Sequence, residues 1–149
     1  ATQWVATIET NVIGLMRVTR TVLDSMVERN SGHIVNIGSV AGIQAYKACA
    51  AYAASKHAVH GLSETLRLDY GATGIKISEV LPGMVETEFA ATRFGDEKRG
   101  EAYYREFGVC LTPQDIARSV RFVLEQPSNV VIAQIVVVPT QRPLVSSTD

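Results

Sequence analysis

Three short apolar runs, each preceded by a long helical pattern, constrain the fold of this chain more than any other sequence feature. The runs occupy residues 33–38, 75–81 and 130–138, and β-branched residues supply most of their apolar side chains. Helical patterns cover residues 2–29, residues 50–73 and a segment that starts at residue 112. The order helix, strand, helix, strand, helix, strand predicts an α/β fold with a parallel sheet and right-handed crossovers.

Local signals set the ends of these elements. A Gly-rich turn at residues 71–74 is predicted to end the second helix. Thr112 is expected to cap the third helix, with Pro113 in its first turn and Asp115 reaching back to the cap. The apolar composition of residues 130–138 predicts a strand that is covered on both faces.

Two segments lack a strong periodic pattern. Residues 86–111 mix Phe, Tyr, Arg and Glu and are predicted to be irregular or short-helical, with a solvated turn at 95–101. Residues 140–149 are predicted to be a polar tail. Three strands are few for this class, the chain does not begin with Met, and no strand precedes the first helix. We therefore expect residues 1–149 to be the C-terminal half of a doubly wound domain whose first strands lie upstream.

Charge and composition exclude several classes of partner. The net charge is −1, the pI is about 6.4 and no Lys/Arg stripe is present, so neither nucleic acid nor an anionic membrane is an expected partner. No apolar run approaches the roughly 20 residues that span a bilayer, and the start of the chain does not resemble a signal peptide. Cys49 and Cys110 are predicted to be free thiols in a reducing cytoplasm.

Four polar side chains stand out against this framework. Ser39 follows the first predicted strand, and Tyr52 and Lys56 lie one turn apart on one face of the second helix. Asn11 interrupts the first helix close to Gly14. Ligands of doubly wound sheets bind beyond the carboxyl ends of the strands, so Ser39 and Tyr52 are predicted to meet over one substrate atom.

This set of side chains suits the interconversion of an alcohol and a carbonyl. A Tyr hydroxyl with its ordinary pKa of roughly 10 is a poor base at neutral pH. The Lys56 ammonium is predicted to lower the pKa of Tyr52, which then exchanges a proton with the substrate. Ser39 is predicted to hydrogen-bond the same substrate oxygen. The hydride needs a cofactor, because no side chain carries one.

The segments around these side chains resemble motifs of the short-chain dehydrogenase/reductase (SDR) family. The run GHIVNIGSVAG at 32–42 is similar to the family's strand-and-serine segment, and YAASK at 52–56 is similar to its Tyr-x-x-Ser-Lys signature. NVIG at 11–14 resembles the helix segment that carries the fourth member of the catalytic tetrad. PGMVET at 82–87 resembles the Pro-Gly motif after the sixth strand. The resemblance covers about residues 2–140.

Carried over by position, the resemblance implies the C-terminal half of a Rossmann-like SDR domain and a role for each motif residue. Tyr52 would be the acid/base, Ser39 would polarise the substrate oxygen, and Lys56 would also bind the nicotinamide ribose. Asn11 would hold a relay water through the backbone of a locally distorted helix, with Gly14 serving close packing or a kink. The cofactor-binding residues implied are Tyr52, Lys56, Pro82, Gly83, Val85 and Thr87, with Thr87 near the nicotinamide carboxamide. No metal ligand is implied.

The chain departs from the family pattern in two ways. Gly38 stands where the family often has the first of two serines, although the acting Ser39 is present. The Gly-rich phosphate turn and the residue that separates NAD from NADP do not occur in this chain. The resemblance implies NADP or NAD as cofactor, with NADP slightly favoured. We expect the segment alone neither to bind cofactor tightly nor to turn over.

Other features have both functional and ordinary interpretations. The resemblance makes residues 86–111 the lid over the substrate, where Arg93 would either meet an acidic substrate or serve lid packing. His57 and His60 share a helix face but lack further ligands, so surface or packing roles are predicted in place of a metal site. The two long helices of SDR proteins pair between subunits, which implies a homo-oligomer, a dimer or a tetramer.

Three hypotheses for function follow. The first is an NAD(P)-dependent oxidoreductase that acts on small hydroxy acids or on aldehydes and ketones. The second is a non-catalytic SDR-like module that binds nucleotide or regulates, and the third is an inactive fragment of an enzyme. The presence of Asn11, Ser39, Tyr52 and Lys56 together favours the enzyme, because a binding module has no need of the whole set.

Overall fold

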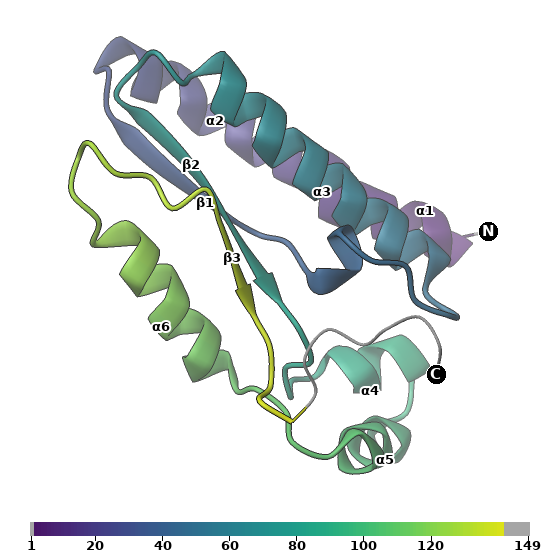
Figure 1. Cartoon of the computed structure of the whole chain (residues 1–149). Coiled ribbons are helices and arrows are strands. Elements are labelled where there is room, and N and C mark those ends of the chain that lie inside the picture. Colours follow the sequence, from purple (N-terminus) through teal and green to yellow (C-terminus); the bar gives the residue numbers. More distant parts are fainter. Residues whose placement is uncertain (1, 142–149) are drawn as a thin grey trace.

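The computed structural model describes residues 2–141, which form a three-stranded parallel sheet with helices on both faces (Figure 1). Along the chain the elements are α1 (Thr2–Ile8), the π-helical segment η1 (Glu9–Gly14), α2 (Leu15–Glu28), β1 (Gly32–Ile37), the 3₁₀ turn η2 (Val40–Gly42), α3 (Ala50–Asp69), β2 (Ile75–Pro82), α4 (Phe89–Phe94), α5 (Glu97–Phe107), α6 (Pro113–Leu124) and β3 (Gln134–Val137). The strand order is β1-β2-β3, and both pairings are parallel. The predicted α/β architecture is confirmed.

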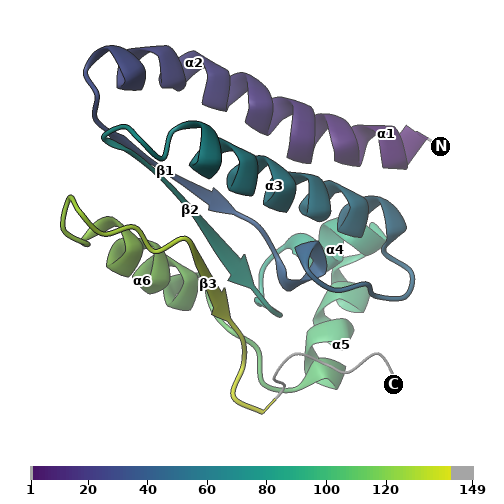
Figure 2. The ribbon, with the colours of Figure 1, turned by 45° about the horizontal axis from the view of Figure 1, so that its top comes forward.

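Helices α2 and α3 cover one face of the sheet, and α6 covers the other (Figures 1 and 2). The central strand β2 is buried along almost its whole length. The apolar core under α2 and α3 consists of Leu23, Ile75 and Ile77, with Met26, Ile34, Leu66 and Tyr70 packed against them. Helices α4 and α5 lie beyond the carboxyl ends of the strands (Figure 1). This is the edge at which ligands of parallel α/β sheets bind.

The helix predicted over residues 2–29 is present, but its hydrogen-bond ladder changes in the middle. The π-helical segment η1 joins α1 to α2, and Figure 2 shows the three as one long rod beside α3. Such π-turns are rare and often occur at functional sites. The distortion that the resemblance implied at Asn11 is therefore real. A Cβ at Gly14 would meet only the Glu9 carbonyl, at 3.4 Å, so close packing against another element does not explain that glycine.

Helix α3 ends at Asp69, earlier than the predicted residue 73. Tyr70 leaves the helical region, and the chain turns tightly back toward β2. The turn is fixed by Asn30, whose Oδ1 accepts a hydrogen bond from the Gly74 amide at 2.8 Å. A Cβ at Gly74 would overlap the Asn30 carbonyl oxygen. This contact joins two turns that are far apart in the sequence and leads the chain out of the helix. Helical periodicity gives no sign of such a contact.

The segment 86–111 contains two short helices, which is one of the two forms predicted for it. The solvated turn predicted over 95–101 is wrong beyond Asp96, because helix α5 begins at Glu97. Gly95 ends α4 in the left-handed region, with φ of 66°. The Asp96 side chain then accepts a hydrogen bond from the Arg99 amide and caps α5, which begins at once. A capping carboxylate directly after a glycine stop therefore makes a helix–helix corner.

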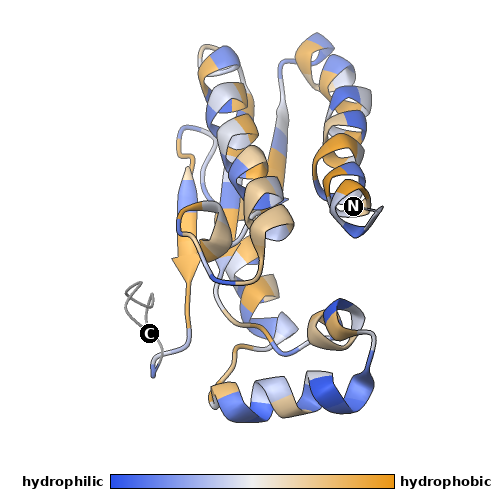
Figure 3. Ribbon diagram, turned by 90° about the vertical axis from the view of Figure 1, so that its right-hand side faces the viewer, coloured by the Kyte–Doolittle hydropathy of each residue, from blue (hydrophilic) through white to orange (hydrophobic). Residues whose placement is uncertain are grey.

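The strand predicted over 130–138 is confirmed only at its C-terminal half, and its predicted coverage on both faces is wrong. Strand β3 spans Gln134–Val137 and pairs with β2 alone among the described strands. Gln134 and Val136 are exposed, although the strand is largely hydrophobic (Figure 3). The helices of the described chain cover β2 more fully than this edge strand. The predicted tail at 140–149 lies outside the described residues from 142 onwards.

No helix within residues 2–141 combines the length and apolar composition needed to cross a membrane.

The cap of α6 provides a direct test of the local structure. Thr112 Oγ1 accepts a hydrogen bond from the Asp115 amide and begins the helix as predicted. Replacing this residue by alanine removes the cap, so Thr112→Ala is expected to lower the free energy of unfolding by about 1 kcal/mol. Urea denaturation would measure the change, with Thr112→Ser, which keeps the cap, as control. Equal losses in both variants would contradict the capping role.

Candidate active site

Ser39 is held at the carboxyl end of β1 by a loop that folds back onto α3. Its backbone is extended, and its Oγ accepts a hydrogen bond from the Ala41 amide at 3.1 Å, which starts η2. Gly42 then lies directly against α3, since a Cβ there would be 2.7 Å from the Lys56 carbonyl oxygen. The loop can approach the helix this closely only because residue 42 has no side chain.

Tyr52 lies in the first turn of α3 and meets Ser39 as predicted. The Ser39 side chain interacts with the Tyr52 hydroxyl, and the Tyr52 ring packs on Phe89 of α4 with ring centroids 5.2 Å apart. Burial raises the pKa of Tyr52 above its ordinary value, and the negative charge available to Cys49 acts in the same direction. The hydrogen bond from Ser39 and the positive charge of Arg93 oppose this rise. In this geometry the Tyr52 hydroxyl keeps its proton at neutral pH.

Lys56 lies one turn after Tyr52, but its ammonium group is engaged elsewhere. Its Nζ donates a hydrogen bond to the Ile37 carbonyl at 2.9 Å and lies 5.8 Å from the centroid of the Tyr52 ring. Burial lowers the pKa of Lys56, and the charge of Glu79 opposes that change. The sequence-based prediction that Lys56 lowers the pKa of Tyr52 is wrong for this arrangement, because burial dominates and the opposing cation is Arg93.

A side-chain relay connects the π-helical segment to Tyr52. Asn11 Nδ2 donates a hydrogen bond to Ser55 Oγ at 3.0 Å, and Ser55 Oγ donates to the Tyr52 carbonyl at 2.7 Å. Ser55 is fully buried, so these bonds satisfy a hydroxyl that has no access to water. Sequence reasoning singled out Asn11 and Tyr52 but assigned no role to Ser55, although this residue is part of the YAASK motif.

The segment after β2 forms a separate part of this edge. Pro82 ends the strand, the Gly83 amide donates to the Val137 carbonyl at 2.8 Å, and Val85 forms an isolated bridge with Leu111. Thr87 Oγ1 accepts a hydrogen bond from the Phe89 amide at 3.2 Å, in the turn that leads into α4.

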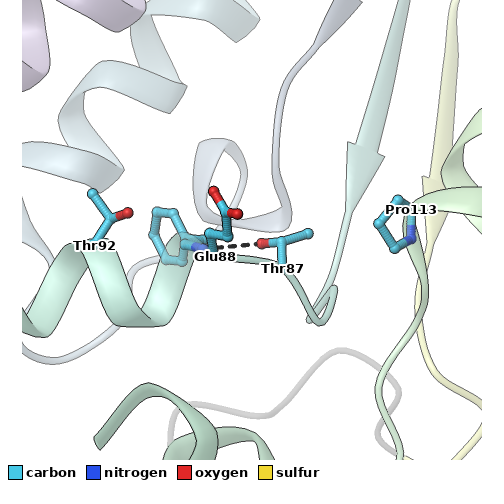
Figure 4. Close-up of a pocket in the computed structure, with 5 residues that line it drawn as sticks. Thr87, Glu88, Thr92 and Pro113 are labelled. Carbon is cyan, nitrogen blue, oxygen red and sulfur yellow. Dashed lines mark hydrogen bonds between the residues drawn. The ribbon is translucent and has the colours of Figure 1, made fainter. Parts of the chain in front are cut away.

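An open hollow of about 540 Å³ is lined by Thr87, Glu88, Phe89, Thr92 and Pro113 (Figure 4). Thr87 is the one member of the predicted cofactor-binding set among these lining residues. Phe89 connects the hollow to Tyr52, because its ring packs on the Tyr52 ring.

Arg93 brings a positive charge to this edge from α4. Its Nη2 donates a hydrogen bond to the Ala48 carbonyl at 2.8 Å, which ties α4 to the loop before α3. Its guanidinium also lies over the Phe94 ring, 5.4 Å from the centroid. Arg93 is exposed and acts on Tyr52 through its charge, so a cation lies near the Tyr52 hydroxyl.

His60 has a defined partner, which the sequence analysis did not predict. Its Nδ1 lies 2.8 Å from Oε2 of Glu79, a carboxylate that is buried completely in the middle of β2. A lone Glu inside an apolar strand was the available sequence signal. His57 instead faces the Ala53 carbonyl on the helix surface. Within the described part of the chain, no three His, Cys, Asp or Glu side chains are arranged to hold a metal ion.

The chain matches known proteins over most of its length. A sequence model described as short chain dehydrogenase matches residues 1–98. The NADP-dependent 3-hydroxy acid dehydrogenase of Schizosaccharomyces pombe is 41% identical over 139 residues, which cover 93% of this chain and 53% of that protein. The chain therefore spans about half the length of such relatives.

Solved structures show the same partial coverage. A serine dehydrogenase in its closed form, complexed with NADP+, superposes with a TM-score of 0.92 and is 39% identical, over 96% of this chain and 58% of that one. A 4-hydroxyisoleucine dehydrogenase mutant complexed with NADH and succinate superposes with a TM-score of 0.73 and is 27% identical. It covers 88% of this chain and 56% of that one. The predicted Rossmann-like fold is confirmed by these superpositions.

The Asn11–Ser55–Tyr52 relay yields a prediction about stability. Ser55→Ala removes both hydrogen bonds of the buried hydroxyl, so it is expected to lower the free energy of unfolding by about 1–2 kcal/mol. Ser25→Ala is the matched control, because its hydroxyl bonds a helix carbonyl on the exposed surface of α2. Denaturation of both variants would compare the losses, and a Ser55→Ala protein as stable as the control would contradict the relay.

Proposed function

The chain belongs to the short-chain dehydrogenase family, and we propose that the complete protein transfers a hydride between NADP and the alcohol or carbonyl group of a small hydroxy acid. The observation that carries this proposal is the meeting of Ser39 and Tyr52 at the carboxyl edge of the sheet, with Lys56 one turn away. A protein that only binds a nucleotide has no use for a serine and a tyrosine hydroxyl brought together at this edge.

The proton chemistry follows from the environment of Tyr52. Burial raises the pKa of its hydroxyl, so at neutral pH the group is a proton donor to an oxygen that gains negative charge as a carbonyl is reduced. Ser39 donates its hydrogen bond to the same oxygen and orients it. For alcohol oxidation the direction reverses, and Tyr52 must lose its proton with the help of the positive charge of Arg93.

The residues present fit a nicotinamide cofactor. When bound, such a cofactor supplies and accepts the hydride. Lys56 has three N–H donors and gives one to Ile37, which leaves two for ribose hydroxyl groups. Pro82, Gly83, Val85 and Thr87 follow β2 at the same edge, where we propose they hold the nicotinamide end. The relatives named for NADP favour NADP, while the relative complexed with NADH keeps NAD as the alternative.

Arg93 is the proposed partner of the substrate carboxylate. The relatives are named for 3-hydroxy acids and serine, which carry a carboxylate close to the reacting carbon. Arg93 lies on α4, whose Phe89 contacts the Tyr52 ring, so its guanidinium can approach a substrate held at Tyr52. A guanidinium offers five donors in a fork that matches a carboxylate. Residues 86–111 would then act as the lid over the substrate.

The complete protein is further proposed to act as a homo-oligomer, a dimer or a tetramer, in the cytoplasm. Helices α1 and α2 expose several large apolar side chains, namely Trp4, Val5, Met16, Val18 and Val22. A second copy of the chain would remove this surface from water.

Replacement of Tyr52 tests the proposed acid/base in the complete protein. Tyr52→Phe keeps the ring that packs on Phe89 but removes the hydroxyl, so kcat with NADP and a 3-hydroxy acid is expected to fall by on the order of 10²–10⁴-fold. Nicotinamide absorbance would follow the reaction, with Tyr70→Phe at the far end of α3 as control. Turnover that survives in Tyr52→Phe would rule out the assigned role.

Replacement of Arg93 tests the substrate class. Loss of hydrogen bonds to a carboxylate costs about 1.5–3 kcal/mol, so Arg93→Gln is expected to lower kcat/KM for a hydroxy acid by about 10–100-fold. Turnover of a neutral alcohol of similar size should fall less, because it loses only the effect of the Arg93 charge on Tyr52 and no contact with a carboxylate. Arg99→Gln is the control, because Arg99 lies over the same Phe94 ring from α5. Equal losses for the acid and the alcohol would contradict recognition of the carboxylate.

A further inference from the structure

Glu79 is a buried carboxylate with only half of its hydrogen-bonding capacity used. Its side chain has no exposed surface, and Oε2 lies 2.8 Å from His60 Nδ1. Oε1 has no hydrogen-bond partner among the described residues. An ionised carboxylate in such a place is costly unless nearby positive charge compensates it, so the charges around Glu79 decide its role.

Gly38 provides the space that this carboxylate occupies. A Cβ built on Gly38 would overlap Oε1 of Glu79 and would press on its carboxyl carbon, 3.0 Å away. Any larger residue at position 38 would therefore displace the Glu79 head group. The departure from the Ser-Ser pattern at Gly38 and the carboxylate at Glu79 are thus two parts of one arrangement.

Lys56 adjoins this arrangement. Its Nζ is bound to the carbonyl of Ile37, the residue next to Gly38, and the charge of Glu79 opposes the fall that burial causes in the pKa of Lys56. Among the described residues, His60 and Lys56 of α3 are the titratable groups with an interaction with the Glu79 carboxylate. The charged Arg67, also from α3, is engaged further along β2 with the carbonyls of Ile77 and Ala133. The strands on either side place neutral residues opposite it, Asn36 on β1 and Gln134 on β3.

His60 links this interior carboxylate to the surface. Its Nε2 lies 3.7 Å from Glu64 Oε1, and the Glu64 side chain is 55% exposed. One ring nitrogen therefore faces a buried carboxylate and the other faces a carboxylate in contact with water. The ring holds Glu79 in place from a helix position that is itself only partly buried.

We propose that Glu79, held by His60 in the space left by Gly38, is a positioning residue that keeps Lys56 cationic at its place beside Ile37. The role of Lys56 in the reaction rests on the proposed function, but its charge state does not. A carboxylate behind the lysine favours the ammonium form, and the ammonium form is the one that can donate to both the Ile37 carbonyl and a ribose hydroxyl.

The sign of the effect follows directly. Removing the negative charge of Glu79 leaves burial unopposed, so the pKa of Lys56 falls further and the ammonium form is lost at lower pH. The pH profile of kcat/KM should then lose activity on its alkaline side at lower pH than the parent does. A role for Glu79 in packing alone would lower stability without moving this alkaline limb.

The test uses the complete protein with Glu79→Gln, which keeps the shape and removes the charge. NMR titration of ¹³C-labelled Lys56 is expected to shift to lower pH by about one unit or more, with a parallel shift of the alkaline limb. Asp69→Asn is the matched control, because it removes an exposed carboxylate near the end of α3. An unmoved Lys56 titration in Glu79→Gln would overturn the proposal.

A second variant protects the test against a folding failure. His60→Gln removes the ring that holds Glu79 Oε2 from a partly exposed position, so the carboxylate is expected to leave its place behind Lys56 and shift the Lys56 titration in the same direction. Gly38→Ser should displace Glu79 and also shift the Lys56 titration to lower pH. When Glu79→Ala is already present, adding Gly38→Ser should shift the Lys56 titration no further. A Lys56 titration that ignores all of these changes contradicts the arrangement.

The titration needs no substrate, so the two proposals fail in different ways. A parent protein that turns over no hydroxy acid, with Lys56 still responding to Glu79, contradicts the proposed function and leaves the electrostatic link intact. Normal turnover with a Lys56 titration and alkaline limb that do not respond to Glu79 contradicts the positioning role and leaves the proposed function intact.

Discussion

The hydrogen bond from Lys56 Nζ to the Ile37 carbonyl ties the first turns of α3 to the carboxyl end of β1. The rest of the site depends on this contact, because it fixes the height at which Tyr52 projects beyond the sheet. Gly42 lets the serine loop lie against the same turn of the helix, so Ser39 reaches Tyr52 without a long connection. The two hydroxyl groups meet because one strand end and one helix start are held together at this point.

A layer of polar side chains continues this attachment along α3. Asn36 donates to Ser63, His60 pairs with Glu79, and Arg67 donates to the carbonyls of Ile77 and Ala133. These contacts fix the helix to β1, to β2 and to the residue before β3 at defined positions, whereas apolar contacts alone would tolerate sliding. The Leu23, Ile75 and Ile77 core lies at the other end of the same interface. That apolar cluster lies at the amino-terminal part of β2, whereas polar contacts set the geometry at the catalytic edge.

Burial shifts the pKa values of the two central groups of the site in opposite directions. It raises the pKa of Tyr52 and lowers the pKa of Lys56, so it favours the neutral form of both. One neighbouring charge opposes burial in each case, Arg93 at Tyr52 and Glu79 at Lys56, although Cys49 reinforces burial at Tyr52. The chemistry of the pair is therefore controlled by residues from β2 and α4, elements that carry neither of the two groups.

The sequence by itself determined the alternation of helices and strands, the capping of α6 and the identities of Ser39, Tyr52, Lys56 and Asn11, because periodicity, caps and short motifs are local properties. Only the tertiary structure decided where α3 ends, how far β3 extends and which charges act on Tyr52 and Lys56. Those outcomes depend on contacts between residues far apart in the chain, such as Asn30 with Gly74 and Gly38 with Glu79, which no local pattern records.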